Sequence, residues 1–528
     1  MQTTGLKWLA LAALGGASMQ AARATDLVAA AESNDRAAVL AELGKGTDAK
    51  ARAPDGTTAL HWAVFHDDAD LVARLIKAGA DVNAANDYGS TPLAEAAVTG
   101  DAAVVKRLLD AGANASAPGK DGETPLMVIA RGGNVEAARL LLDHGADVNA
   151  QEAWRGQTAL IWAAAQKQPD MVRLLVTRGA NANARSTVPE WDRQVSAERR
   201  RQYRPFGGLT ALMYAAREGC VDCARALVEG GADPDLPGYR GVTPLIMAID
   251  NLNFDTAAYL LDAGASLDVW DWWGRTPLYM AVDMDTLPHG GRPDRASTDT
   301  TTGLQLIERM LAKGASPDSQ LKLLPPYRER GADRGCDALL VTGSTPLLRA
   351  AKTFDVPAMK LLIAHGARLD LPNSSGITPF MAAAGYGSLE CDIRGYGPGI
   401  PHYMTTDVQA KSIAALQVLV DAGANVNAAT TGGGNAPGGR GKSPGQTALF
   451  GAAFWGWTDV VKFLAAHGAK LDMQDAQGRT ALDAALGRAG GHERGASIKV
   501  FKETVDALQQ LCSQQEGCKI AVPGPASS

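Results

Sequence analysis

The chain has 528 residues, of which 46% are hydrophobic and 5% are aromatic. Its 51 Lys and Arg residues face 57 Asp and Glu residues, and the resulting net charge of −6 argues against nucleic acid as a general partner. The six cysteines are compatible with an oxidising compartment, where disulfides persist.

The N-terminal stretch up to Ala24 differs from the rest of the chain. Lys7 precedes an apolar run over residues 8–17, and Ala22-Arg23-Ala24 has the small-x-small form of a signal-peptidase site. The run is too short to span a membrane, and no later segment is a candidate for a span. We therefore predict a signal peptide over residues 1–24, cleavage after Ala24 and location in the periplasm, with secretion as the alternative. Cleavage would remove Lys7 and Arg23 and so change the net charge from −6 to −8.

From Thr25 onward a Thr recurs two residues before a Leu or Phe, and most of these threonines are separated by the same step as Thr25 and Thr58. Thr25 would be the first residue after the predicted cleavage. A fixed period of this size indicates a stack of structural repeats. We number twelve repeats from these threonines, which are Thr25, Thr58, Thr91, Thr124, Thr158, Thr210, Thr243, Thr276, Thr345, Thr378, Thr447 and Thr480.

Each repeat has the sequence expected of two short helices followed by a hairpin or loop. The Thr can cap the first helix, and the Pro that often follows it has a preset φ and no N–H group to leave unpaired. The first helix is rich in Ala, which lets neighbouring layers approach closely, and the second carries Val and Leu at helical spacing. A Gly then ends the second helix where a positive φ is usually needed. These glycines are Gly79, Gly112, Gly145, Gly179, Gly231, Gly264, Gly366, Gly423 and Gly468.

This pattern resembles that of the ankyrin-repeat family, over nearly the whole chain after Ala24. Repeat two shows it in full, from Leu60-His61-Trp62-Ala63 to Gly79-Ala80-Asp81-Val82-Asn83-Ala84. The resemblance implies an all-α repeat solenoid of about twelve ankyrin repeats over residues 25–511, followed by a C-terminal tail over residues 512–528. Because ankyrin arrays bind many unrelated partners, the fold alone does not name the partner.

Steps longer than the common period predict long insertions in repeats five, eight and ten. Repeat five is extended on its hairpin side, whereas repeats eight and ten are extended both between their helices and in their hairpins. The first insertion is basic and aromatic, and it either clamps an acidic partner or a neighbouring subunit, or is a solvated loop whose arginines pair with acidic hairpin tips. The insertions are expected near residues 185–208, 283–302, 316–343, 385–410 and 428–446.

Aromatic residues concentrate at the positions that vary and face solvent in the ankyrin family. These positions lie four, three and one residues before the repeating Thr, and seven and eight residues after it. Trp and Tyr exposed on a concave face are typical of binding surfaces, although tip residues such as Trp272 and Trp273 could instead pack beneath the insertions. The predicted protein-binding residues are Phe65, Tyr88, Trp154, Phe206, Tyr239, Trp272, Trp273, Tyr386, Phe454 and Trp455.

A Cys-x-x-Cys pair, Cys220 and Cys223, lies at the start of the second helix of repeat six, where a thiolate would be stabilised. Ala224 follows the pair in place of the His that c-type haem attachment requires. We predict a local disulfide. A reduced buried pair and a redox site remain as alternatives.

The other four cysteines lie outside the regular repeats. Cys512 and Cys518 are close in sequence beyond the last repeat, and we predict that they staple the C-terminal cap. Cys336 and Cys391 remain as a third pair by elimination, although the repeat pattern places their insertions on opposite edges of the stack.

Two further features imitate ligand-binding motifs. Residues 436–443 fit a loose form of the phosphate-binding loop, but Pro444 follows at once where a helix should begin. Asp283, Asp285 and His289 could approach one metal ion, but they lie in a Gly- and Pro-rich insertion. We therefore predict no cofactor, no metal site and no catalytic residue.

These observations favour a non-enzymatic protein–protein interaction scaffold in the periplasm of a Gram-negative bacterium, which binds its partner through the concave face and the hairpin tips. Resemblance to exported bacterial ankyrin proteins implies that the partner is another exported protein, with periplasmic redox enzymes among the candidates. One alternative is a secreted effector that acts on host proteins. The other is an enzyme, or a redox or metal accessory protein, whose site is built from the insertions of repeats eight and ten around Asp283, Asp285, His289, His402 and Asp407.

Overall fold

The computed structural model describes residues 27–188, 207–271, 274–285, 298–322, 342–387, 407–431, 443–488 and 500–520. The chain divides into two compact segments, residues 1–154 and residues 155–528, which we describe separately as the N-terminal and C-terminal segments. Nearly all regular structure in the described residues is helical, and none of these helices has both the length and the apolar character needed to cross a membrane.

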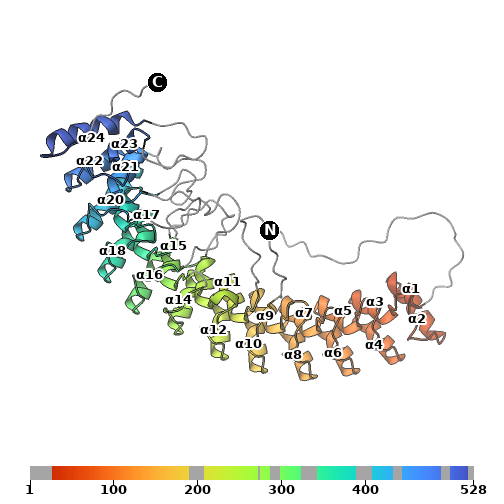
Figure 1. Ribbon diagram of the computed structural model, residues 1–528. Coiled ribbons are helices and arrows are strands. Elements are labelled where there is room, and N and C mark those ends of the chain that lie inside the picture. The colour runs from red at the N-terminus through yellow and green to blue at the C-terminus, as the bar shows by residue number, and fades with distance from the viewer. Residues whose placement is uncertain are drawn as a thin grey trace, which may run out of the picture. The chain divides into compact units, whose positions relative to one another are not determined.

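The N-terminal segment is a two-layer stack of short helices (Figure 1). One layer is formed by α1, α3, α5 and α7, each packed against the next, and α4, α6 and α8 form the other layer. Within each repeat the first helix packs against the second. The helices are α1 (Leu27–Glu32), α2 (Arg36–Gly44), α3 (Ala59–Phe65), α4 (Ala69–Lys77), α5 (Pro92–Thr99), α6 (Ala102–Asp110), α7 (Pro125–Gly132) and α8 (Val135–Asp143).

The C-terminal segment repeats the same two layers, with the odd-numbered helices α9 to α23 in one and the even-numbered helices α10 to α24 in the other (Figure 1). Its helices are α9 (Ala159–Ala165), α10 (Pro169–Thr177), α11 (Ala211–Glu218), α12 (Val221–Glu229), the 3-10 turn η1 (Tyr239–Gly241), α13 (Pro244–Asp250), α14 (Phe254–Asp262), α15 (Pro277–Asp285), α16 (Gly303–Ala312), α17 (Pro346–Lys352), α18 (Val356–Ala364), α19 (Pro379–Ala383), α20 (Val408–Asp421), α21 (Ala448–Trp455), α22 (Thr458–Ala466), α23 (Ala481–Ala485) and α24 (Lys502–Gln514).

The repeating threonines start the first helices, as the sequence predicts. Thr58 has extended backbone angles, and its side chain accepts a hydrogen bond from the backbone N–H of His61, so that one of the free donors at the start of α3 is satisfied. Thr25 lies outside the described residues. The same cap is formed by Thr91, Thr124, Thr158, Thr210, Thr243, Thr345 and Thr378.

The predicted glycines at the ends of the second helices all have positive φ. The angle is +93° at Gly79 and +86° at Gly468, and a Cβ atom added at either glycine would meet no heavy atom within 4 Å. The requirement for Gly at these positions is therefore conformational and does not arise from crowding.

Successive hairpins are joined by backbone hydrogen bonds. The N–H of Asp87 donates to the carbonyl of Asp55 at 2.8 Å, and the N–H of Ala153 donates to the carbonyl of Asp121 at 2.8 Å. A Cβ atom added at Gly122 would lie 2.9 Å from the nitrogen of Ala153, so here Gly also permits close approach of the next hairpin.

The hairpins of repeats five, eight and ten are closed by backbone hydrogen bonds at their bases. The N–H of Ser186 donates to the carbonyl of Leu209 at 3.0 Å, and the pairs Leu321–Ser344 and Thr430–Gln446 are joined in the same way. The hairpin of repeat two is closed in the same way, by a hydrogen bond from the N–H of Asn86 to the carbonyl of Ser90 at 3.0 Å.

Candidate functional site

Four of the predicted binding residues are exposed. Phe65, the last residue of α3, keeps 43% of its surface accessible, and the hairpin residues Tyr88, Trp154 and Tyr239 keep 70%, 77% and 44%. Exposed aromatic side chains on hairpin tips and first-helix ends are the kind of surface that protein partners bury.

In the N-terminal segment these exposed residues are held by local contacts. The ring of Phe65 lies edge-on to Trp62, with 5.7 Å between ring centroids, and also contacts the ring of His66. The turn that carries Tyr88 is fixed by Asn86, whose side-chain oxygen accepts hydrogen bonds from the N–H groups of Tyr88 and Ser90. Less side-chain and loop freedom is lost on binding when a surface is ordered beforehand.

The sequence pattern did not predict the exposed apolar residues Val98, Val188, Trp270 and Val500, of which Val98 and Trp270 are the most informative. Val98 lies seven residues after Thr91, at one of the family's variable positions, but is not aromatic; it is 70% exposed at the end of α5. Trp270 lies outside those positions and is 52% exposed, and the amine of Lys322 lies 3.3 Å from its ring centroid. A search for any large apolar residue in a hairpin would have found Trp270.

The prediction of exposure is wrong for Tyr386 and Trp455, which are 5% and 4% exposed. The Trp455 indole N–H donates to the carbonyl of Gly385 at 2.9 Å, and the Tyr386 hydroxyl donates to the side-chain oxygen of Gln446 at 2.6 Å. A Cβ atom added at Gly451 would lie 2.5 Å from the nitrogen of Tyr386, so the absence of this atom lets the turn after α19 approach α21 closely. Burial in this contact raises the pKa of Tyr386.

Phe454 is partly exposed, and its ring lies edge-on to that of Trp455. The remaining predicted residues lie outside the described parts of the chain. They are the binding residues Phe206, Trp272 and Trp273, the cysteines Cys336 and Cys391, the histidines His289 and His402, and the predicted signal peptide.

The acidic residues proposed for an insertion-built site do not come together as a metal centre. Asp283 lies within α15 and not in a loop, and its carboxylate accepts a hydrogen bond from the Arg349 guanidinium at 2.6 Å, with both side chains buried. Asp407 is exposed and paired with Lys411 at 2.6 Å. Within the described residues, no three His, Cys, Asp or Glu side chains are grouped so that they could hold a metal ion.

Asp285 ends α15 beside Asp355, the N-cap residue of α18. Burial and the neighbouring Asp355 carboxylate raise the pKa of Asp285 to about 6, although a hydrogen bond from the backbone of Leu304 acts in the opposite direction. Burial also raises the pKa of Asp355. The two carboxyl groups therefore share one proton under mildly acidic conditions. We assign this contact to the packing of α15 against the start of α18 and not to a ligand site.

A second buried ion pair, also missed by the sequence reasoning, holds the hairpin before α15. The Arg275 guanidinium donates to Asp271 at 2.7 Å and lies 3.8 Å from Asp250. Burial alone would lower the pKa of Arg275, but these carboxylates outweigh it and raise the pKa. The same Asp-x-x-x-Arg spacing before the repeating Thr recurs at Asp475 and Arg479, which also pair at 2.7 Å, so a sequence signal existed.

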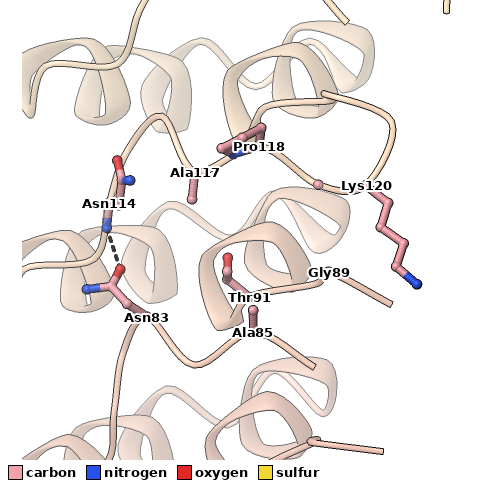
Figure 2. A pocket seen from close by; sticks show the side chains of 9 residues that line it. Asn83, Ala85, Gly89, Thr91, Asn114, Ala117, Pro118 and Lys120 are labelled. Atoms are coloured by element: carbon pink, nitrogen blue, oxygen red, sulfur yellow. Dashed lines mark hydrogen bonds between the residues drawn. The ribbon is translucent and has the colours of Figure 1, made fainter. Parts of the chain in front are cut away.

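A shallow hollow of about 520 Å³ lies between the loops of repeats two and three (Figure 2). At one end the N–H of Asn114 donates to the side-chain oxygen of Asn83 at 2.7 Å, and the Asn83 amide donates to the carbonyl of Gly112 at 3.0 Å. The Lys120 side chain extends away from the other labelled residues in Figure 2. Asn183 and Asn427 form the same bridge in later repeats, so we assign this hollow to loop stacking and not to a ligand.

Among the described residues, two cysteine pairs form disulfides. The sulfur atoms are 2.05 Å apart between Cys220 and Cys223 and 2.01 Å apart between Cys512 and Cys518. Cys220 is the N-cap residue of α12, whereas Cys512 lies in the last turn of α24. The two disulfides are thus placed at opposite ends of their helices.

The paired helices, the Thr caps, the left-handed Gly and the joined hairpins together define an all-α repeat array. Comparison with family models assigns the family, with matches to "Ankyrin repeats (3 copies)" over residues 27–118 and 100–186, to "Ankyrin repeat" over residues 207–239 and to "Ankyrin repeats (many copies)" over residues 449–498. The chain is an ankyrin-repeat protein. Such repeats typically form non-enzymatic surfaces for protein–protein interaction. A search of curated proteins finds no matching relative.

Proposed function

We propose that this protein is an exported, non-enzymatic scaffold that binds another exported protein in the periplasm. The observation that carries the proposal is the set of exposed aromatic residues on hairpin tips and first-helix ends, represented by Phe65 and Tyr88. Both side chains belong to the N-terminal segment, and local contacts hold the ring of Phe65 and the turn that carries Tyr88. A partner would bury these side chains at little cost in ordering.

Site-specific crosslinking tests the proposed surface. A photoreactive phenylalanine analogue is placed at Tyr88 in one variant and at Glu136, an exposed residue of α8 in the other helix layer, in a matched control. We expect Tyr88 to crosslink in the native compartment to one defined protein that the Glu136 variant does not capture. Equal crosslinking from both positions would contradict binding through the hairpin tips.

Export is a separate part of the proposal. It rests on the apolar run over residues 8–17 and on Ala22-Arg23-Ala24, and it predicts that the mature protein begins at Thr25. N-terminal sequencing of protein from a periplasmic fraction tests it. A chain that still begins at Met1, or that is absent from this fraction, would remove export from the proposal and leave the binding surface to be tested alone.

A further inference from the structure

The start of α12 differs from the starts of α2, α4, α6 and α18 in its N-cap residue. Asp35, Asp68, Asp101 and Asp355 cap their helices by accepting a hydrogen bond from a backbone N–H in the first turn. In repeat six the residue at this position is Cys220. Its backbone angles, φ −98° and ψ 88°, are close to the −90° and 81° of Asp68, so the sulfur atom occupies the place of a capping carboxylate.

The Cys220 sulfur already accepts a hydrogen bond from the N–H of Cys223 at 3.2 Å while it is part of the disulfide. Reduction would leave an anionic sulfur at this position, where the free N–H groups and the positive end of the α12 dipole stabilise a negative charge. A sulfur that is stabilised as a thiolate is also a good leaving group in disulfide exchange.

The two cysteine residues differ in exposure. Cys220 keeps 8% of its surface accessible, whereas Cys223 is fully buried. Cys220 is therefore the less buried residue of the pair and the one that a thiol from another molecule would attack, and Cys223 is placed to release or to resolve the bond formed there.

The second disulfide provides an internal comparison. Cys512 lies in the last turn of α24, near backbone carbonyls that have no partner within the helix. A thiolate would be disfavoured there by the negative end of the helix dipole. Of the two pairs, reduction is thus favoured at Cys220–Cys223 and resisted at Cys512–Cys518.

We propose that Cys220–Cys223 is a thiol–disulfide exchange site that oxidises a dithiol on a partner protein or peptide. A partner thiolate attacks the sulfur of Cys220, the bond to Cys223 breaks, and the Cys223 sulfur leaves with the electron pair and takes up a proton. The second partner thiolate then attacks the partner sulfur of the mixed disulfide, and Cys220 leaves as a thiolate into the helix cap. Two electrons pass from the partner to the pair, the partner gains a disulfide, and one of its two protons goes to solvent.

The first test compares the two disulfides in the same full-length oxidised protein. The protein is equilibrated in glutathione buffers of graded composition, quenched with acid, alkylated and mapped by peptide. We expect Cys220–Cys223 to be half reduced at a ratio of [GSH]² to [GSSG] at least about tenfold lower than Cys512–Cys518 requires. Equal resistance of the two pairs, or greater resistance of Cys220–Cys223, would overturn the proposal.

The second test measures exchange with a peptide that carries two reduced cysteines. The oxidised protein should convert it to the disulfide form, and Cys512→Ser should not change the rate. When a Cys223→Ser variant is treated with the disulfide form of the peptide, it should accumulate a mixed disulfide between Cys220 and the peptide. Cys220→Asp combined with Cys223→Ala introduces the Asp cap that begins α2, α4, α6 and α18, and should keep helical content while losing exchange. Exchange by this double variant at the original rate would contradict the assignment.

Discussion

Asp283 and Arg349 form a buried ion pair between the first helices of two neighbouring repeats. The two side chains belong to α15 and α17, which pack against each other, and they pair at 2.6 Å with almost no exposed surface. Removal of one partner of a buried pair leaves an uncompensated charge away from water, which costs more than the pair itself contributes. The role of Asp283 is therefore structural, although its sequence position suggested a ligand.

Replacement of Asp283 by Ala is expected to destabilise the C-terminal segment by about 3–5 kcal/mol because Arg349 would remain buried and charged. The double variant Asp283→Leu/Arg349→Met should recover most of this loss. Asp407→Ala is the control, since its pair with Lys411 is exposed and should contribute less than about 1 kcal/mol. Urea unfolding followed by circular dichroism measures all three, and equal effects of Asp283→Ala and Asp407→Ala would show that the burial is not maintained in solution.

Asp285 gives a prediction about pH. Its pKa is raised to about 6, so the folded chain binds this proton more tightly than the unfolded chain, in which the pKa is near 3.8. The contribution of Asp285 to stability is therefore greatest at low pH and is lost as the pH rises from about 4 to about 6. Asp285→Asn should raise the unfolding midpoint at pH 7.5 and have little effect at pH 4. The same gain at both pH values would contradict the shared proton.

At the scale of the helix and the hairpin, much of the local structure could be predicted from the sequence. The Thr caps and the Gly residues after the second helices lie where the pattern places them, because both depend on backbone conformation within one repeat. The burial of Tyr386 and Trp455 could not be predicted in this way. It depends on contacts between two repeats, in which Tyr386 lies against Gly451 and Trp455 against Gly385, and no property of a single repeat signals such contacts.

Two glycines of the N-terminal segment allow the stability cost of an unfavourable backbone conformation to be distinguished from the cost of a steric clash. Gly122 and Gly145 have similar φ values of +76° and +84°, but only at Gly122 would an added Cβ atom meet a neighbouring backbone atom, at 2.9 Å. Gly145→Ala should cost about 1–2 kcal/mol for the left-handed conformation. Gly122→Ala should cost at least about 1 kcal/mol more because the hairpins must also separate. Thermal unfolding of the two variants measures this difference, and equal costs would show that the hairpins are not in close contact.

At the scale of the whole molecule, the repeat period predicts the architecture but not the distribution of exposed aromatic residues. The family's variable positions identified Phe65, Tyr88, Trp154 and Tyr239 correctly as exposed. They predicted exposure wrongly for Tyr386, which follows α19, and for Trp455, the last residue of α21, because both side chains are buried. Whether a side chain is available to a partner is thus decided by how the neighbouring repeats pack against it.

The affinity for the crosslinked partner is the most direct test of the proposal that exposed aromatic residues form the binding surface. Phe65→Ala/Tyr88→Ala should weaken this affinity at least about 30-fold, which corresponds to about 2 kcal/mol, while the helical content stays unchanged. Glu136→Ala/Arg139→Ala, on the exposed side of α8, is the matched control and should bind like the unaltered protein. Titration by isothermal calorimetry measures all three proteins. Unchanged affinity of the aromatic double variant, with its fold intact, would contradict the proposed binding surface.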